Sequence, residues 1–122
     1  MKILLVDDDA FLRDMYAMKF TESGYEVDAA DSPATALRKI EESKKFDVIL
    51  LDMIMPGMTG VELILKIKEL YPDMKAKCVV LSNQGQEADI EEAEQAGAVG
   101  YIVKAEMIPS DVVKKVEKIM KA

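Results

Sequence analysis

The sequence predicts an α/β fold in which a doubly wound parallel β-sheet carries helices on both faces. Short apolar runs, typical of buried strands, alternate with amphipathic segments, typical of helices, along the 122 residues. The connections are short, and no internal repeat or low-complexity segment interrupts this alternation. Strict alternation of this kind is typical of βα units joined by right-handed crossovers. We therefore expect one domain, spanning residues 1–122.

The strand segments differ in their apolar pattern, and the difference predicts their order in the sheet. Residues 2–6, 48–52, 76–81 and 99–103 are nearly continuous apolar runs, as expected for strands buried on both faces. Residues 25–30 alternate between apolar and polar side chains, which indicates a half-exposed edge strand. The first and third strands both end in aspartate, which favours placing them side by side at the centre. These features favour the strand order 2-1-3-4-5.

Each strand is followed by a segment with helical periodicity, and several of these segments carry end signals. Gly24 is well placed to end the first helix. Ser32 and Pro33 form an N-cap followed by proline at the first helical position. Thr59 and Glu62 have the spacing of a capping box. The five helices are expected at about residues 10–23, 33–43, 60–70, 86–96 and 110–121.

Composition excludes several classes of function. The net charge of −7 argues against a nucleic-acid surface, which needs clustered Lys and Arg. The absence of histidine excludes a His-based triad, a His metal site and a phosphohistidine on this chain. No apolar stretch has the length of a membrane span, and Met1-Lys2 leads directly into a strand, so no signal peptide is expected. Cys78 lies within an apolar run, which favours a buried thiol in a cytoplasmic protein.

Four of the predicted strands deliver polar residues at their carboxyl ends. Asp7 and Asp8 follow the first strand, Asp52 ends the third, and Ser82 and Lys104 follow the fourth and fifth. Carboxyl ends of parallel strands meet at one edge of the sheet, where ligands bind. Oxygen ligands without His or Cys favour Mg²⁺ or Mn²⁺, and a lysine and a hydroxyl beside them suit a phosphoryl group. With no Ser–His or Cys–His pair available, the nucleophile would be an aspartate.

Each of these residues also has an ordinary structural explanation. Asp9 stands next to the first helix and is better explained as its N-cap than as a metal ligand. A lone lysine after a strand is usually solvated, and Ser82 could simply begin a turn. The functional interpretation is favoured because all of these residues converge on the same edge.

The residues that carry this prediction resemble a known family. The resemblance to the receiver domain of two-component response regulators covers the whole chain, and it implies a flavodoxin-like (βα)5 fold with strand order 2-1-3-4-5. Since the family has this strand order, the strand pattern and the resemblance are not two independent predictions of it. The matching motifs are Leu5-Val6-Asp7-Asp8-Asp9, Leu50-Leu51-Asp52-Met53-Ile54-Met55-Pro56-Gly57-Met58-Thr59-Gly60, Val80-Leu81-Ser82 and Gly100-Tyr101-Ile102-Val103-Lys104.

The resemblance implies a role for each residue of the site. Asp52 would accept a phosphoryl group from a phosphohistidine of a sensor histidine kinase or a phosphotransfer protein. Asp8 and Asp52 would bind Mg²⁺ directly, Asp7 would bind it through water, and the backbone carbonyl of Ile54 would complete the protein ligands. Lys104 would pair with a phosphoryl oxygen. The chain would catalyse only its own phosphorylation and dephosphorylation and would not otherwise be an enzyme.

The resemblance also implies how the signal leaves the site. Ser82 would move toward the phosphoryl group, and Tyr101 would turn inward into the space released. A changed surface on the fourth helix, fifth strand and fifth helix would then contact a downstream protein or a covalently linked output domain, with no direct role for nucleic acid or membrane. The acidic fourth helix and the lysine-rich fifth helix allow a weak dimer through this surface, although two solvated faces on a monomer are the favoured explanation.

Three positions depart from the common pattern of this family. Ala105 replaces a proline that often follows the lysine in a cis peptide, and a cis bond here would cost about 3 kcal/mol, which favours a trans bond. Asn83 is bulkier than the usual alanine after Ser82. Ile54 is apolar where many members have a polar side chain near the attacking water, and we hypothesise that it slows hydrolysis of the acyl phosphate.

The sequence also leaves three alternative functions open. A degenerate receiver would act as a binding module without taking a phosphoryl group. A magnesium-dependent phosphatase with an aspartate nucleophile would usually show Asp-x-Asp followed shortly by Ser or Thr, and the segment after Asp9 lacks that hydroxyl. A flavodoxin-like cofactor binder is disfavoured because three aspartates in the first loop would repel a phosphate.

Overall fold

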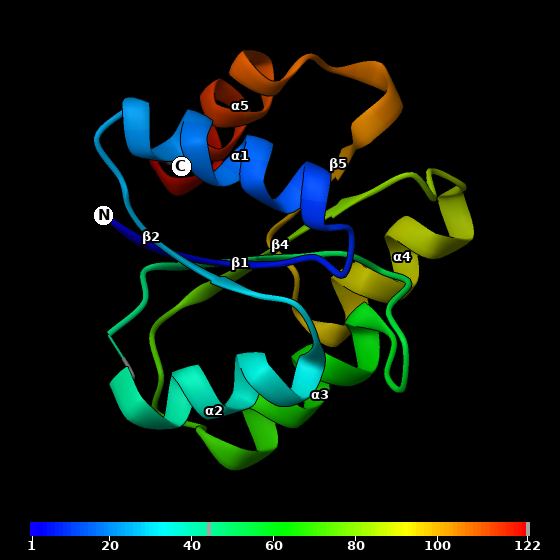
Figure 1. Cartoon of the computed structure of the whole chain (residues 1–122). Helices are drawn as coiled ribbons and strands as arrows, with labels where there is room; N and C mark the ends of the chain where they lie inside the picture. Colours follow the sequence, from blue (N-terminus) through cyan, green and yellow to red (C-terminus); the bar gives the residue numbers. More distant parts are fainter. Residues whose placement is uncertain (44, 122) are drawn as a thin grey trace.

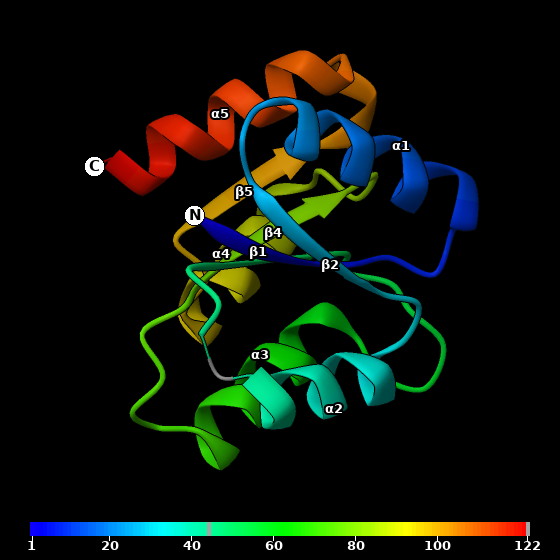
Figure 2. The ribbon, with the colours of Figure 1, turned by 60° about the vertical axis from the view of Figure 1, so that its left-hand side comes forward.

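A five-stranded parallel sheet forms the centre of the protein. The computed structural model describes residues 1–43 and 45–121. Within them the strand order is β2-β1-β3-β4-β5, which confirms both the predicted order and the edge position of β2. The strands all run in one direction, toward the edge of the sheet that carries the predicted site (Figure 2). They are β1 (Lys2–Val6), β2 (Glu26–Ala30), β3 (Val48–Leu51), β4 (Lys77–Ser82) and β5 (Gly100–Val103).

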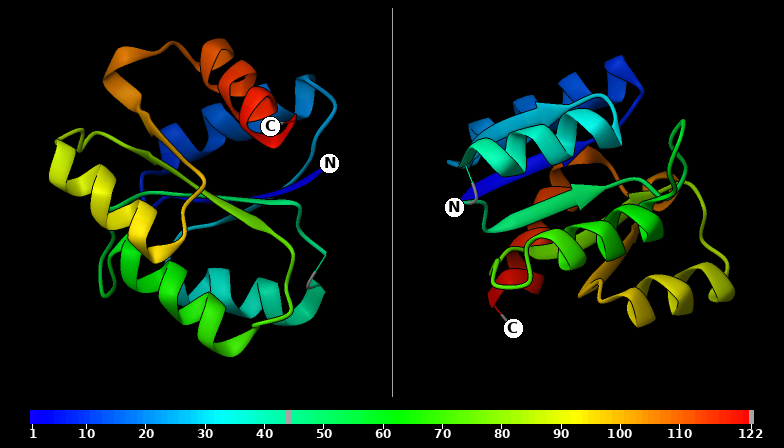
Figure 3. Two further views of the ribbon diagram at one scale, coloured as in Figure 1. Left: turned by 180° about the vertical axis from the view of Figure 1, so that it is seen from behind. Right: turned by 90° about the horizontal axis from the view of Figure 1, so that it is seen from below.

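Helices cover both faces of the sheet. One face carries α1 (Ala10–Glu22) and α5 (Pro109–Lys121), which lie side by side (Figure 1). The other face carries α2 (Pro33–Ser43), α3 (Gly60–Leu70) and α4 (Glu87–Ala96), which are seen as a row from below (Figure 3). This is the doubly wound, flavodoxin-like arrangement that the sequence predicts. Among the described residues, no helix has the length and apolar character needed to cross a membrane.

The continuous apolar runs arise because the central strands contribute to two cores. On β3, Val48 and Leu50 pack toward α1 and α5, whereas Ile49 and Leu51 pack toward α2, α3 and α4. All four side chains are fully buried. A strand with one solvated face would alternate between buried and exposed side chains instead. Each Leu→Ala substitution in such a strand is of the kind that costs about 2–5 kcal/mol.

The register of the strands fixes where the site residues emerge. Val6 pairs with Leu51, so Asp7 and Asp52 are the next residues on the two neighbouring strands. The main-chain N–H of Asp52 donates to the Val6 carbonyl at 3.2 Å and extends this pairing by one residue. The sheet therefore holds the backbone of Asp52 rigidly.

The three helix-end signals are confirmed, and the predicted ends agree with the structure to within one residue. Thr59 Oγ1 accepts from the Glu62 N–H at 3.1 Å, and the Glu62 carboxylate accepts from the Thr59 N–H at 3.0 Å, which completes the capping box of α3. Ser32 Oγ accepts from the Thr35 N–H at 3.2 Å at the start of α2. Gly24 has a φ of +93°, the left-handed conformation expected just after α1.

The end of α4 depends on a second glycine and on a lysine from α3. Gly97 has a φ of +111°, and a Cβ at this position would collide with the ammonium group of Lys68. Lys68 therefore places a positive charge at the carboxyl end of α4, where the helix dipole favours a cation.

Replacing Gly97 by alanine is expected to destabilise the protein more than replacing Gly24 by alanine. Both changes force alanine into a left-handed conformation, at about 1–2 kcal/mol each. A Cβ at Gly24 meets no atom within 4 Å, whereas one at Gly97 must also displace Lys68. The displaced cation should add about 0.3–1 kcal/mol to the loss in free energy of unfolding, measured with urea. The additional destabilisation of Gly97→Ala should disappear in a Lys68→Met background. An equal loss in free energy of unfolding for both glycine substitutions would contradict this account of α4.

Candidate functional site

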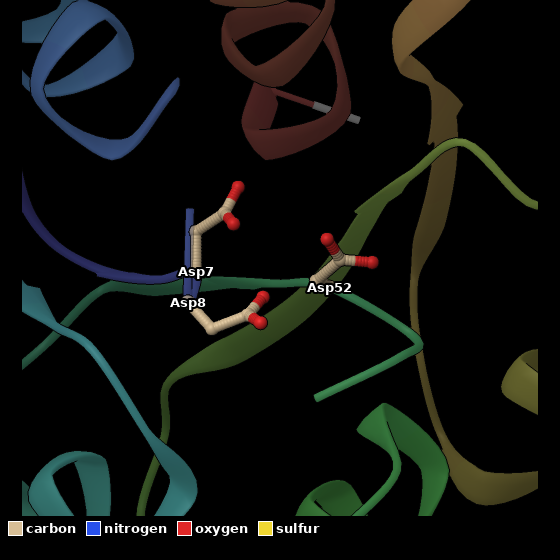
Figure 4. A group of neighbouring side chains, drawn as sticks. All are labelled: Asp7, Asp8 and Asp52. Atoms are coloured by element: carbon tan, nitrogen blue, oxygen red, sulfur yellow. The ribbon is translucent and has the colours of Figure 1, made fainter. Parts of the chain in front are cut away.

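Three aspartates converge at the carboxyl edge of the sheet. One carboxylate oxygen from each of Asp7, Asp8 and Asp52 lies within 4.8 Å of the others. Asp7 and Asp8 are consecutive residues at the end of β1, and the Asp8 side chain extends toward the side on which Asp52 follows β3 (Figure 4). Asp7 is fully buried, Asp52 is partly buried and Asp8 is exposed. The cluster is thus anchored on the protein side and open on the solvent side.

Lys104 joins two of these carboxylates. Its Nζ lies 2.8 Å from Asp7 Oδ2 and 2.8 Å from Asp52 Oδ2, and its side chain is 6% exposed. Burial alone would lower the pKa of Lys104. The hydrogen bonds and charges of Asp52 and Asp7 outweigh burial, so the pKa lies above its ordinary value. The ammonium group is therefore charged at neutral pH and offsets part of the repulsion among the acids.

Asp7 is fixed by hydrogen bonds to both its backbone and its side chain. Its N–H donates to the Ala30 carbonyl at 3.1 Å, its Oδ1 accepts from the Asp9 N–H at 3.0 Å, and its Oδ2 accepts from Lys104. Its main-chain carbonyl accepts from Arg13 Nη1 at 2.9 Å. Asp7 is thus a rigid part of the site, and its carboxylate is already engaged within the protein.

The loop after β3 packs closely against Asp52. The Gly60 N–H donates to the Met53 carbonyl at 2.8 Å, and a Cβ at Gly60 would collide with the carbonyl oxygen of Asp52. Only glycine permits this approach between the start of α3 and the end of β3. The Ile54 N–H lies 3.3 Å from Asp52 Oδ1, and the Ile54 side chain is 60% exposed beside the cluster.

Ser82 and Tyr101 lie on the neighbouring strands β4 and β5. Ser82 is buried, and its Oγ accepts from the Gln84 N–H at 3.1 Å. The hydroxyl of the half-buried Tyr101 donates to the Gln84 carbonyl. Burial raises the pKa of Tyr101, and the nearby charges of Asp89 and Asp52 add to this effect. Gln84 in the loop after β4 therefore connects the two residues.

One expectation about a neighbouring residue is confirmed, and the isomer of one peptide bond that the sequence left open is now given. Asp9 is the N-cap of α1, where its Oδ1 accepts from the Leu12 N–H at 3.1 Å, and it lies outside the cluster of three aspartates. The described residues contain no cis peptide bond, so Lys104 and Ala105 are joined by a trans bond. The chain continues there into a short 3₁₀ helix, η1 (Lys104–Glu106), which the sequence does not predict.

Two residues of the site were not predicted from the sequence. Arg13 reaches back from α1 to the carbonyl of Asp7. Tyr16 lies buried close enough to the site for the charges of Lys104, Asp7 and Asp52 to act on its hydroxyl, although burial is the main reason that its pKa is raised. Both follow Asp9 by one to two helical turns, a spacing that places them near the strand ends but gives no direct signal of contact.

The donor set fits a hard divalent cation. The cluster offers carboxylate oxygens and contains neither His nor Cys, which favours Mg²⁺ or Mn²⁺ over zinc. The buried hydroxyl of Ser82 lies at the end of β4, and Lys104 directly follows β5. Fold and site together define a flavodoxin-like α/β protein with an acidic, lysine-bridged centre at the carboxyl edge of its sheet.

Comparison with known proteins agrees with this class. A family model described as the response regulator receiver domain matches residues 3–117. The chemotaxis protein CheY of Thermotoga maritima is 40% identical over 121 residues, covering 98% of each chain. The transcriptional regulatory protein ResD of Bacillus subtilis is 34% identical, over 98% of this chain and 48% of ResD. The structure of Vibrio cholerae CheY4 superimposes with a TM-score of 0.87 at 30% identity, covering 97% of each chain.

The chain belongs to the response regulator receiver domain family. It is similar over nearly its full length to CheY proteins, and it contains the acidic site that the sequence predicts. It is therefore a signalling module of two-component systems rather than a classical enzyme.

Proposed function

We propose that Asp52 accepts a phosphoryl group from a phosphohistidine of a partner kinase or phosphotransfer protein. The bridging position of Lys104, 2.8 Å from the carboxylates of both Asp7 and Asp52, is the main observation that supports this proposal. It places a buried cation at the residue that would carry the new negative charge. Residues 1–122 would form a receiver domain.

The transfer would need little from the protein beyond alignment and charge neutralisation. A carboxylate oxygen of Asp52 forms a bond to phosphorus as the bond from phosphorus to the histidine nitrogen breaks, and the bonding electrons leave with the imidazole. The backbone of Asp52, paired to β1, holds the nucleophile in place. Lys104 is the cation that would face the phosphoryl oxygens.

The metal-binding roles divide according to exposure. Asp8 and Asp52 would hold Mg²⁺ directly together with the main-chain carbonyl of Ile54, whereas the buried Asp7 would contribute through water. The engagement of both Asp7 oxygens by protein donors supports this division. When bound, Mg²⁺ would neutralise charge that develops on the transferring phosphoryl group.

The signal would leave through β4 and β5. Ser82 would move toward the phosphoryl group and Tyr101 would turn inward, and the shared contact at Gln84 supports their coupling. The changed surface on α4, β5 and α5 would bind a downstream protein or a linked output domain. We propose that this occurs in the cytoplasm, with the protein acting as a monomer or a weak dimer through the same surface.

Intact-mass spectrometry with acetyl phosphate as the phosphoryl donor tests the proposal. With Mg²⁺, the wild-type protein should gain one phosphoryl group, and without metal it should gain none. Donor consumption without an adduct would indicate rapid self-hydrolysis or phosphatase activity. An unconsumed donor would contradict the proposal and leave a degenerate receiver that acts as a binding module.

Replacing Ile54 by asparagine is expected to shorten the lifetime of the aspartyl phosphate. The exposed Ile54 side chain offers no hydrogen bond to an attacking water beside Asp52, whereas asparagine can orient one. We expect hydrolysis to become about tenfold faster, which corresponds to about 1.4 kcal/mol of barrier. The rate is followed by intact mass after removal of the donor. Leu65→Asn, at an equally apolar and exposed position on α3, is the matched control and should leave the rate unchanged.

A further inference from the structure

Arg13 bridges both ends of the acidic turn between β1 and α1. Its guanidinium Nη1 donates to the main-chain carbonyl of Asp7 at 2.9 Å. Its main-chain N–H donates to the carbonyl of Asp9 at 2.9 Å, within the first turn of α1. Asp8 stands between these two anchor points. One residue of the helix thus holds the turn that presents Asp8.

The carbonyl that Arg13 holds belongs to the peptide unit between Asp7 and Asp8. A peptide unit is planar, so fixing its carbonyl oxygen fixes the orientation of the whole plane and of the Asp8 Cα. The Asp7 side chain has its own restraints in Asp9 and Lys104. Asp8 is exposed, and the direction of its carboxylate therefore depends on the backbone that carries it.

We propose that Arg13 is a positioning residue of the metal site, which holds the Asp7–Asp8 peptide so that the Asp8 carboxylate faces Asp52. This inference rests on the proposed function, because it concerns the binding of Mg²⁺ to the same acids. Arg13 would be a ligand of neither the metal nor the phosphoryl group. Its effect is exerted through the backbone of the turn.

If Arg13 acted only through its charge, its removal would change the Mg²⁺ affinity in the opposite direction. The pKa of the exposed Asp31 is lowered mainly by a hydrogen bond from Thr35, with a further contribution from the charge of Arg13. The charge of Arg13 therefore acts on at least one carboxylate, that of Asp31, at this edge of the sheet. If charge were its whole effect, removing it would leave the acids more negative and would tighten Mg²⁺ binding. Loss of positioning would weaken binding, so the sign of the change separates the two roles.

Isothermal titration with Mg²⁺ at constant ionic strength is the test. Arg13→Met should weaken Mg²⁺ binding by about tenfold or more, the range for residues that orient metal ligands. Arg13→Lys retains the charge and a donor and should restore much of the affinity. Lys19→Met is the matched control, because it removes the same charge from α1 at a residue that pairs with Glu22 at 3.7 Å, away from the turn. The Mg²⁺ affinity of Lys19→Met should stay within about twofold of the wild-type value.

The outcomes separate this inference from the proposed function. Unchanged or tighter Mg²⁺ binding by Arg13→Met, with normal binding by the wild type, would overturn the role of Arg13 and leave the proposed function intact. Absence of Mg²⁺ binding by the wild type would overturn both. Urea unfolding without metal would check that each variant is folded.

Discussion

Asp52→Asn is expected to abolish phosphoryl uptake from acetyl phosphate. Asparagine keeps the size of the side chain and an oxygen that can accept from the Ile54 N–H, but it lacks the anionic oxygen that would attack phosphorus. Loss of a nucleophile typically lowers a rate by about 10⁴-fold or more, so no adduct should be detectable. The measurement is intact mass in the presence of Mg²⁺.

Two aspartate-to-asparagine variants serve as controls for this experiment. Asp9→Asn changes the same acidic run, but asparagine is an equally good N-cap for α1, so both folding and uptake should be retained. Asp47→Asn changes the residue that precedes β3, where Asp47 accepts from the Lys2 N–H at 2.8 Å, far from the site. An adduct on Asp52→Asn, or loss of the adduct in Asp9→Asn, would place the acceptor at another residue.

The fold and most of the site were predictable because both depend on the order of residues along the chain. Continuous apolar runs identify central strands, and parallel strands must bring their carboxyl ends to one edge. Asp7, Asp52 and Lys104 follow their strands directly, so knowing the strands is enough to bring these three residues together. The caps at Asp9 and Thr59 were predictable for the same reason, since they depend on neighbours three residues away.

Features that depend on packing were not predictable in this way. Phe11 and Met18 share the helical spacing of α1 with buried residues, yet they are 77% and 56% exposed. Periodicity identifies a helix, but the neighbouring elements decide which of several apolar stripes is covered. In α3, Leu65 is exposed and Leu63 is buried, because Leu63 faces the sheet. The contact of Arg13 with a backbone carbonyl has no sequence signature either, since any residue type supplies the acceptor.

Lys104→Met is expected to destabilise the metal-free protein strongly. The substitution keeps an apolar side chain of similar length but leaves Asp7 and Asp52, 1% and 13% exposed, without the cation that bridges them. Removing one partner of a buried ion pair typically costs about 3 kcal/mol or more of unfolding free energy. Lys39→Met is the control, because its pair with Asp28, at 2.7 Å, is 25% and 38% exposed and should contribute less than about 1 kcal/mol.

The pH dependence of this loss follows from the raised pKa of Lys104. A group whose pKa is higher in the folded state stabilises the protein fully below its unfolded value, about 10.4 for lysine, and loses this effect as pH rises through the folded value. The difference in unfolding free energy between wild type and Lys104→Met should therefore persist from neutral pH to about pH 10 and shrink only above it. A difference that already closes at pH 8–9 would show that the ammonium is not held by both carboxylates.

Magnesium should reverse much of the same loss. Without Lys104 the three carboxylates carry more uncompensated charge, so Mg²⁺ should bind Lys104→Met more tightly than wild type. Binding to the folded state alone raises the free energy of unfolding, by about 2.7 kcal/mol at a hundredfold excess over the dissociation constant. Titrating Mg²⁺ during urea unfolding should thus bring the variant close to wild type. A loss that Mg²⁺ does not repair would mean that Lys104 acts through packing, and that the acids are not a shared site for cation and ammonium.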